Sequence, residues 1–370
     1  MTYAFLPHAD TTWLCLANGP QVTPLAPAPG MADAIRRFSS DGSEFGFLDL
    51  SGKRMGHYRL LQQAPWIECL LAPTALPKSC AAADFVIHKG TLIAGGKVAK
   101  GEALWARRPA VDVAWRPIPL PEGVGKLGKS IDALFVRDNK LIAVDDHILP
   151  KWLLVYPLEP ELRCDGVEKI KLQSHTSYEQ VVRATEGKDY YALYSVGWNH
   201  GRILNYIALI RRSDLKQVAV WSGLLPPSID KLNSDLKQDE LMTDDLEVPD
   251  DIQRQQQTDA VLKQWNMEKD HAETTLGPMF KSMQDMAFCG KYLVLALGES
   301  GLGIADANAK VNAEIKNGKG AKTSFIPWPL KVLRSVQRLQ CPFENAIGFY
   351  AIGLDSAGAM SYEWVPMPSC

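Results

Sequence analysis

The chain has 370 residues, of which 46% are hydrophobic and 22% are charged. These fractions are ordinary for a folded globular protein, and they exclude a disordered chain, a collagen-like fibre and an extended coiled coil. With 40 Lys+Arg against 42 Asp+Glu the net charge is -2, so no global basic field indicates nucleic-acid binding. The length predicts about two domains, although a large all-β architecture can use this much chain as one unit.

The sequence contains no recognisable membrane or export segment. No apolar run approaches the roughly 18 residues that span a bilayer, and the first basic residue is Arg36, so no secretory signal is predicted. The seven cysteines are widely spaced, odd in number and without a CxxC pair, which argues against a disulfide framework or a zinc site. We therefore expect a cytoplasmic protein that binds no membrane, metal or cofactor.

Pairs of short apolar segments joined by a tight turn recur along the chain. They are rich in Val, Ile, Tyr and Phe and are bounded by turn residues, as strands are. The mid-strand residues Leu48, Ala94, Ala143 and Leu193 are 46, 49 and 50 positions apart, and Ala296 and Ala351 follow after 103 and 55. The long interval equals one repeat plus an insertion of about fifty residues. The hairpins predicted in this way lie at 34–50, 84–96, 132–145, 180–196, 284–298 and 335–353.

A second, less regular pair of strands follows several of these hairpins. Examples are 103–107 with 115–120, 152–157 with 167–172, and 206–211 with 217–221. Each unit thus holds about four antiparallel strands in 40 to 50 residues, which is the size of a propeller blade. The chain resembles a β-propeller at the level of the fold: an all-β domain over 1–370 with six or seven four-stranded blades. Two stacked β-sandwiches remain an alternative, and no WD or kelch signature identifies a family.

Closure of the ring is expected from the two ends of the chain. The resemblance implies that N- and C-terminal strands share one blade, with Thr12–Ala17 or Gln21–Ala26 completing the last one, because closure removes exposed sheet edges. The tryptophans at 105, 115, 152, 221 and 364 lie inside the strand pattern. We interpret them as packing between blades rather than as a sugar-binding surface.

Residues 223–281 interrupt the strand rhythm and form an acidic, largely helical insertion between blades. Val261, Trp265, Ala272 and Leu276 share one side of a helix predicted over about 251–273, which Asp250 or Asp251 would cap. From 230 to 273 there are 13 Asp+Glu and 5 Lys+Arg, a net charge of -8, which leaves +6 for the rest of the chain. The resemblance places this insertion above the face on which propellers usually bind their ligands.

Our first hypothesis is therefore a non-enzymatic, cytoplasmic protein-binding propeller. It would contact a basic protein through this face, in the manner of an inhibitor or immunity-type protein that caps a toxin or an enzyme. It would bind no nucleic acid. The predicted contact residues are Asp239, Glu240, Asp244, Asp245, Glu247, Asp250, Asp251, Trp265, Trp198 and Asn199.

Two other functions remain open. Polar residues follow the predicted second strands, and among them Asp146, His147, His200 and Glu299 have the acid–base character of a hydrolase acting on a sugar, lactone or ester. The same predicted loops hold Asp145, Ser300 and Asp355. Turns favour such residues for conformational reasons alone. The third possibility is an architectural subunit of a larger complex, in which blade edges would form the binding surface.

Overall fold

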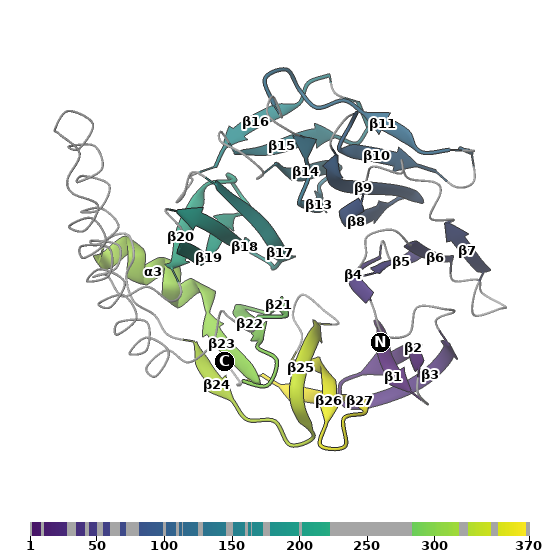
Figure 1. Cartoon of the computed structure of the whole chain (residues 1–370), viewed down its shortest axis with the longest axis vertical. Helices are drawn as coiled ribbons and strands as arrows, with labels where there is room; N and C mark the ends of the chain where they lie inside the picture. Colours follow the sequence, from purple (N-terminus) through teal and green to yellow (C-terminus); the bar gives the residue numbers. More distant parts are fainter. Residues whose placement is uncertain are drawn as a thin grey trace, which may run out of the picture.

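The computed structural model describes residues 2–8, 11–27, 35–40, 44–49, 55–59, 67–71, 81–98, 101–108, 111–112, 114–124, 129–145, 151–159, 162–163, 165–172, 178–199, 202–222, 283–317, 325–341 and 347–367. The strands within these ranges form seven antiparallel sheets, here called blades A to G in chain order. Figure 1 shows the blades arranged around a ring, with β4, β8, β13, β17 and β21 nearest its centre. The chain is an all-β propeller, as its hairpin spacing predicted.

The first three blades occupy the N-terminal third of the chain. Blade A contains β1 (Thr2–His8), β2 (Thr11–Asn18) and β3 (Gln21–Pro27). Blade B contains β4 (Ile35–Ser40), β5 (Glu44–Asp49), β6 (Met55–Arg59) and β7 (Ile67–Leu71). Blade C contains β8 (Ala81–His88), β9 (Thr91–Val98), β10 (Leu104–Arg107), β11 (Arg116–Ile118) and the short β12 (Lys129–Ser130), which pairs with β9.

The other four blades complete the ring. Blade D contains β13 (Ala133–Arg137), β14 (Lys140–Asp145), β15 (Trp152–Pro157) and β16 (Glu168–Lys171). Blade E contains β17 (Tyr178–Glu186), β18 (Tyr190–Asn199), β19 (Arg202–Arg211) and β20 (Gln217–Ser222). Blade F contains β21 (Asp285–Cys289), β22 (Tyr292–Ala296), β23 (Leu302–Asp306) and β24 (Ile326–Trp328). Blade G contains β25 (Leu333–Gln340), β26 (Gly348–Asp355) and β27 (Met360–Pro366).

Tight turns join the inner two strands of several blades. Asp138 and Asn139 have φ values of 49° and 58°, and Lys89 and Gly90 have values of 47° and 71°. Two central residues with positive φ define a type I′ turn, whose twist matches that of the flanking strands. The turn residues between the apolar segments thus adopt the backbone conformation that these turns require. The hairpins predicted at 84–96 and 132–145 are confirmed.

Side chains between neighbouring blades form the core. Phe135 of blade D stacks on Tyr191 of blade E with ring centroids 4.4 Å apart, and both are 1% exposed. Trp115 and Trp221 are buried in the clusters between blades B and C and between blades E and F. Trp105, Trp152 and Trp364 pack against such clusters as well. The interpretation of these tryptophans as packing between blades is confirmed.

The expected pairing of terminal strands in one blade is wrong. β1, β2 and β3 pair only with one another, and β25, β26 and β27 form a separate three-stranded sheet. The turn at Gly19, whose φ is 61°, joins β2 to β3 within blade A. Blades A and G instead pack face to face through Leu6, Tyr350 and Ile352. Backbone–side-chain bonds between Phe5 and Gln340 (2.9 Å) and between Arg338 and Phe5 (3.3 Å) add to this contact.

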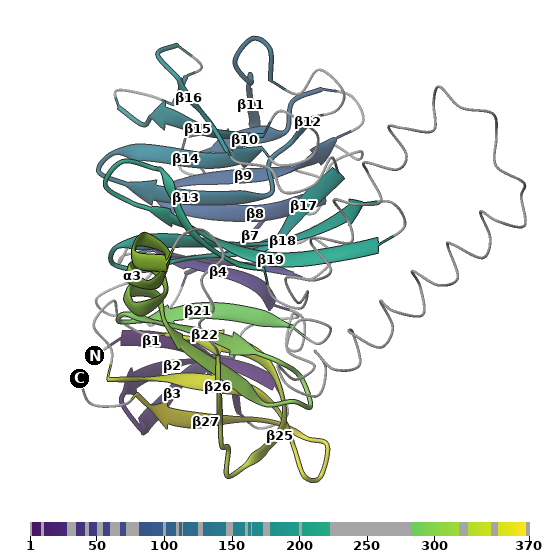
Figure 2. The same cartoon turned by 90° about the vertical axis from the view of Figure 1, so that its left-hand side faces the viewer.

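One helix, α3 (Ala307–Asn317), lies within the described residues, between β23 and β24. Asp306 accepts a hydrogen bond from the backbone N–H of Ala309 at 3.0 Å and so caps its first turn. Figure 2 shows α3 on one side of the ring, against blade E. Glu314 accepts a hydrogen bond from the N–H of Val220 at 3.0 Å, which satisfies the outer edge of β20. The helix predicted at about 251–273, like the whole insertion 223–281, lies outside the described residues.

Candidate functional site

One end of the ring, here called the loop face, contains the connections between second and third strands. The second strands of blades D to G end there at Asp145, Asn199, Ala296 and Asp355. In an antiparallel blade the connection from the fourth strand to the next blade leaves from the same end. Because β20 ends at Ser222 and β21 begins at Asp285, both attachment points of the acidic insertion lie on the loop face. The opposite end, here called the hairpin face, contains the turns between first and second strands.

The structure describes part of the set of polar residues predicted on the loop face. Asp145 is 3% exposed, whereas Glu299 and Ser300 are exposed in a turn closed by the bond from Gly301 N–H to the Gly298 carbonyl. Trp198 and Asn199 end β18 opposite Ile203 and Arg202. Outside the described residues lie Asp146, His147, His200, Asp239, Glu240, Asp244, Asp245, Glu247, Asp250, Asp251 and Trp265.

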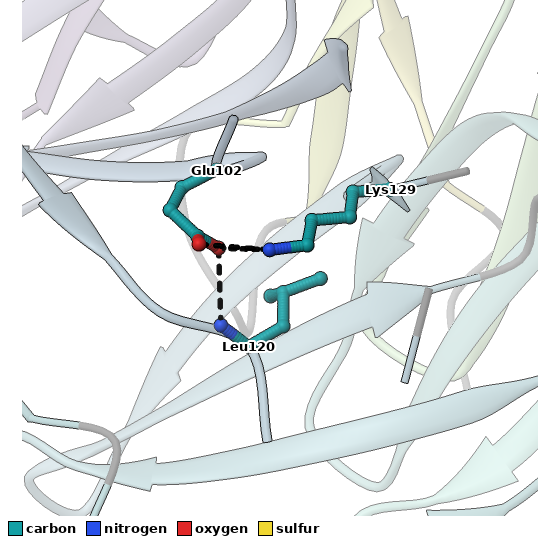
Figure 3. A network of polar contacts seen from close by, with 3 residues as sticks. All are labelled: Glu102, Leu120 and Lys129. Carbon is teal, nitrogen blue, oxygen red and sulfur yellow. Dashed lines mark hydrogen bonds and ion pairs between the residues drawn. The ribbon is translucent and has the colours of Figure 1, made fainter. Parts of the chain in front are cut away.

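Two carboxylates of the loop face build local structure. Asp355 Oδ1 accepts hydrogen bonds from the N–H groups of Ala357 (2.8 Å) and Ala359 (3.0 Å), so this aspartate stabilises its own turn. Figure 3 shows Glu102, in the connection between β9 and β10, with both oxygens 2.8 Å from Lys129 Nζ. The same carboxylate accepts the Leu120 N–H at 3.3 Å. These bonds secure the segment after β11 to blade C, and they occupy the carboxylate.

Two aspartates near the ring centre, the buried Asp84 and the partly buried Asp285, connect one blade to the next. Asp84 Oδ1 accepts the N–H of Phe85, and Asp84 Oδ2 accepts the N–H of Leu134 in blade D, both at 2.8 Å. Asp285 repeats this arrangement with Met286 (2.9 Å) and with Leu339 of blade G (2.9 Å). Each aspartate stands four residues before the last residue of its strand. We call these two residues the inter-blade aspartates.

Two arginines lie beside the second inter-blade aspartate. Arg183 donates to the carbonyls of Gln284 (2.8 Å) and Val182 (2.7 Å). Burial raises the pKa of Asp285, an effect that its hydrogen bond from Leu339 and the charges of Arg183 and Arg338 oppose. Burial lowers the pKa of Arg338 to about 10, although the Asp285 charge opposes this. The side chains of Arg183, Asp285 and Arg338 form hydrogen bonds to backbone groups of neighbouring blades. They therefore join blades.

The inter-blade aspartates were not singled out in the sequence, although a signal was present. An aspartate is the first or second residue of three of the repeated hairpin segments, at Asp84, Asp132 and Asp285. Asp132 is also buried, and Ser130 Oγ donates to its Oδ1 at 2.8 Å. An acidic residue at a repeated position next to apolar strands indicates a buried carboxylate with fixed donors, because an unsatisfied one would be costly.

A cavity of about 300 Å³ lies on the hairpin face between blades D and E. Its walls combine aliphatic side chains with charges of both signs. One wall is the turn after β19, in which Leu215 has a φ of 55°. The lining residues are Arg137, Asp138, Lys140, Ile142, Val155, Glu168, Ile170, Arg212, Ser213, Asp214 and Leu215.

Arg211 fixes the ionisation of Asp214 in this wall, which gives a testable pH dependence. Arg211 Nε and Nη2 donate to the two Asp214 oxygens at 3.0 and 2.7 Å, and this bond lowers the carboxyl pKa from 3.8 to about 2. Because the folded-state pKa is depressed, the contribution to stability is present above pH 4 and is lost as the pH falls toward 2. We expect Arg211→Gln to return the Asp214 pKa toward 3.8, measured by ¹³C-carboxyl NMR. A titration unchanged from wild type would show that Arg211 is not the cause.

Two absences hold for the part of the chain that the structure describes. No group of three or more His, Cys, Asp or Glu side chains is arranged to hold a metal ion. No helix in the described ranges is long and apolar enough to span a bilayer.

No protein-family model matches the chain, and no curated protein sequence matches it. Among solved structures it is similar to the computationally designed Ika8 protein, with 8% identity and a TM-score of 0.43 over 98% of this chain and 96% of that one. It is also similar to Kuenenia stuttgartiensis hydrazine synthase, with 9% identity and a TM-score of 0.47 over 99% and 94%. A third is YCF48 bound to D1 peptide, with 10% identity and a TM-score of 0.38 over 99% of each chain. Likenesses of this size do not indicate a shared activity or ligand.

Proposed function

We propose that this chain is a cytoplasmic protein-binding propeller that holds a basic protein against its loop face. The observation behind the proposal is the attachment of the acidic insertion: β20 ends at Ser222 and β21 begins at Asp285 on that face. The stretch 230–273 has a net charge of -8 against +6 for the remainder. A concentration of one charge next to a rigid platform attracts and orients an oppositely charged partner.

The chemistry of the described residues agrees with binding by a scaffold. The carboxylates of Glu102 and Asp355 are occupied by Lys129 and by backbone N–H groups, so they serve the platform. The ring is stabilised by packing between blades and by the inter-blade aspartates, which gives a rigid platform for binding. The finer form of the proposal is an inhibitor or immunity-type protein that caps a toxin or an enzyme. In this form Asp239, Glu240, Asp244 and Asp245 contact the partner's basic residues.

A charge-matched pair of variants tests this proposal. The loop-face variant replaces Asp239, Glu240, Asp244 and Asp245 by their amides. The control variant makes the same change at four acids toward the hairpin face, the exposed Asp138, Glu159 and Asp189 and the partly exposed Asp112. Partners are captured from source-cell lysate with the wild-type chain, identified by mass spectrometry, purified and titrated by calorimetry. We expect a stoichiometric basic partner whose affinity falls at least about tenfold in the loop-face variant and little in the control.

Salt and deletion extend the test. Affinity for the wild-type chain should fall as ionic strength rises, because exposed charges are screened beyond about 8 Å at physiological salt. Replacement of 226–278 by a Gly/Ser linker should abolish the complex. Equal binding by the linker variant would overturn the proposal. The proposal would also be overturned if neither the wild-type chain nor the linker variant captured a partner. Hydrolase screening with Asp146→Ala and His200→Ala variants would then follow.

A further inference from the structure

Two cysteines meet at the interface between blades F and G. Cys289 is the last residue of β21, directly before the turn at Gly290 and Lys291. Cys341 directly follows Gln340, the last residue of β25. Both belong to the same apolar cluster, together with Phe349 and Ala351. The two residues are 52 positions apart in sequence but lie in adjacent blades.

The two thiols are in direct contact. Cys289 and Cys341 are both reduced, and their side chains form a hydrogen bond with each other. That bond and burial both raise the pKa of Cys289. Cys289 is 1% exposed, whereas Cys341 is partly exposed. One thiol of the pair is thus accessible to a small reagent, and the other lies behind it.

An inter-blade aspartate holds the two strands in this register. Asp285 Oδ2 accepts a hydrogen bond from the Leu339 N–H at 2.9 Å. Asp285 stands four residues before Cys289, and Leu339 stands two residues before Cys341. The Cys289 end of β21 is also fixed by its pairing with Tyr292. The contact between the thiols therefore belongs to the interface between blades F and G.

We propose that Cys289 and Cys341 form a reversible oxidation site that links blades F and G. The oxidant is a low-molecular-weight disulfide of the glutathione type. The Cys341 thiolate attacks one sulfur of that disulfide, which forms a mixed disulfide and releases one thiol. The Cys289 thiol then attacks the Cys341 sulfur and displaces the second thiolate, which takes up the Cys289 proton and leaves as a thiol. Two protein thiols become one disulfide, and one small disulfide becomes two thiols.

The order of the two steps follows from exposure. Attack requires access to the reagent, which Cys341 has and Cys289 lacks. The second step is intramolecular between groups already in contact, so its effective concentration is high. The product closes a loop from 289 to 341 and joins the inner strand of blade F, where the chain resumes after the insertion, to blade G. We expect a higher melting temperature for the oxidised protein, because a closed loop restricts the unfolded chain.

The test compares cysteine variants of the full chain under defined redox conditions. Folded, reduced protein is incubated at pH 7.5 with reduced and oxidised glutathione in varied ratio, quenched with an alkylating reagent and mapped by non-reducing peptide mass spectrometry. We expect a peptide pair joined through Cys289 and Cys341, which dithiothreitol reverses. Cys289→Ser should instead accumulate the glutathione adduct on Cys341, whereas Cys341→Ser should leave Cys289 largely unmodified.

Cys15 provides the matched control. It is 1% exposed, its thiol donates to the Trp13 carbonyl at 3.6 Å, and burial raises its pKa to about 11. Cys15→Ser should therefore leave the Cys289–Cys341 link unchanged. The proposal is overturned if the wild-type peptide map shows no such link, or if the link forms only in urea. These results come from the wild-type chain, so the test stands even if a serine variant does not fold.

Discussion

Asp84→Ala is expected to lower the free energy of unfolding by about 3 kcal/mol, because two buried N–H groups would lose their acceptor. Asp84 is 4% exposed and accepts hydrogen bonds from Phe85 and from Leu134 of the next blade. The measurement is urea unfolding followed by tryptophan fluorescence. A wild-type midpoint in this variant would show that the carboxylate does not hold the blades together.

Asp355 is a control of matched chemistry for this prediction. Its carboxylate also accepts two backbone N–H groups, from Ala357 and Ala359, but these bonds are exposed to solvent. Water replaces an exposed acceptor at little cost, so Asp355→Ala should lower stability by less than about 1 kcal/mol. The difference between the two variants isolates the effect of burial. Equal losses would indicate that turn formation, rather than burial, determines the cost.

Glu314→Ala is expected to cost about 3–5 kcal/mol, the range observed when one member of a buried ion pair is removed. Lys310 and Glu314 have side chains only 2% and 7% exposed, and their charged atoms are 2.9 Å apart. Glu314 also accepts the Val220 N–H, so the variant removes one of the hydrogen bonds between α3 and blade E. Lys310 Nζ lies 5.9 Å from the centre of the Trp221 ring, which makes tryptophan fluorescence a local probe of the change.

The double variant Lys310→Met with Glu314→Leu separates charge from packing. Replacing both members of a buried pair by apolar groups of similar volume is often neutral or stabilising. We expect the double variant to recover most of the stability lost in Glu314→Ala, measured by thermal unfolding. A double variant as unstable as the single one would show that the hydrogen bond to Val220, rather than the buried charge, dominates.

The architecture could be predicted from the sequence because each hairpin is a local feature. Apolar strands joined by turn residues such as Asp138 and Asn139 fold with their neighbours, so spacing along the chain gives the blades. The sheet to which the N-terminal strands belong was predicted wrongly. The apolar pattern of these strands fits pairing with blade G as well as pairing within blade A. The helix α3 is short and was not predicted, although its cap at Asp306 and its Ala, Lys and Glu content are typical of a helix.

The candidate site was less predictable than the fold. Polar residues in turns look alike in sequence whether they build the turn or bind a ligand, and Asp355 builds its turn. Each inter-blade aspartate accepts a hydrogen bond from a residue about fifty positions later in the chain. These partners can be identified only once the packing of the blades is known. The acidic insertion was recognisable by composition, and its role as a contact surface remains a prediction.

The contact between blades A and G has a consequence for synthesis on the ribosome. No strand is shared between these two sheets, and blade A is complete once Pro27 has emerged. Each blade can therefore pair its strands in the order in which they are translated, without an unpaired strand waiting for the end of the chain. The final event is the docking of two finished sheets through Leu6, Tyr350 and their neighbours. A nascent chain arrested before residue 348 should then hold formed blades in an open arc, detectable by protection of the β13–β14 amides from hydrogen exchange.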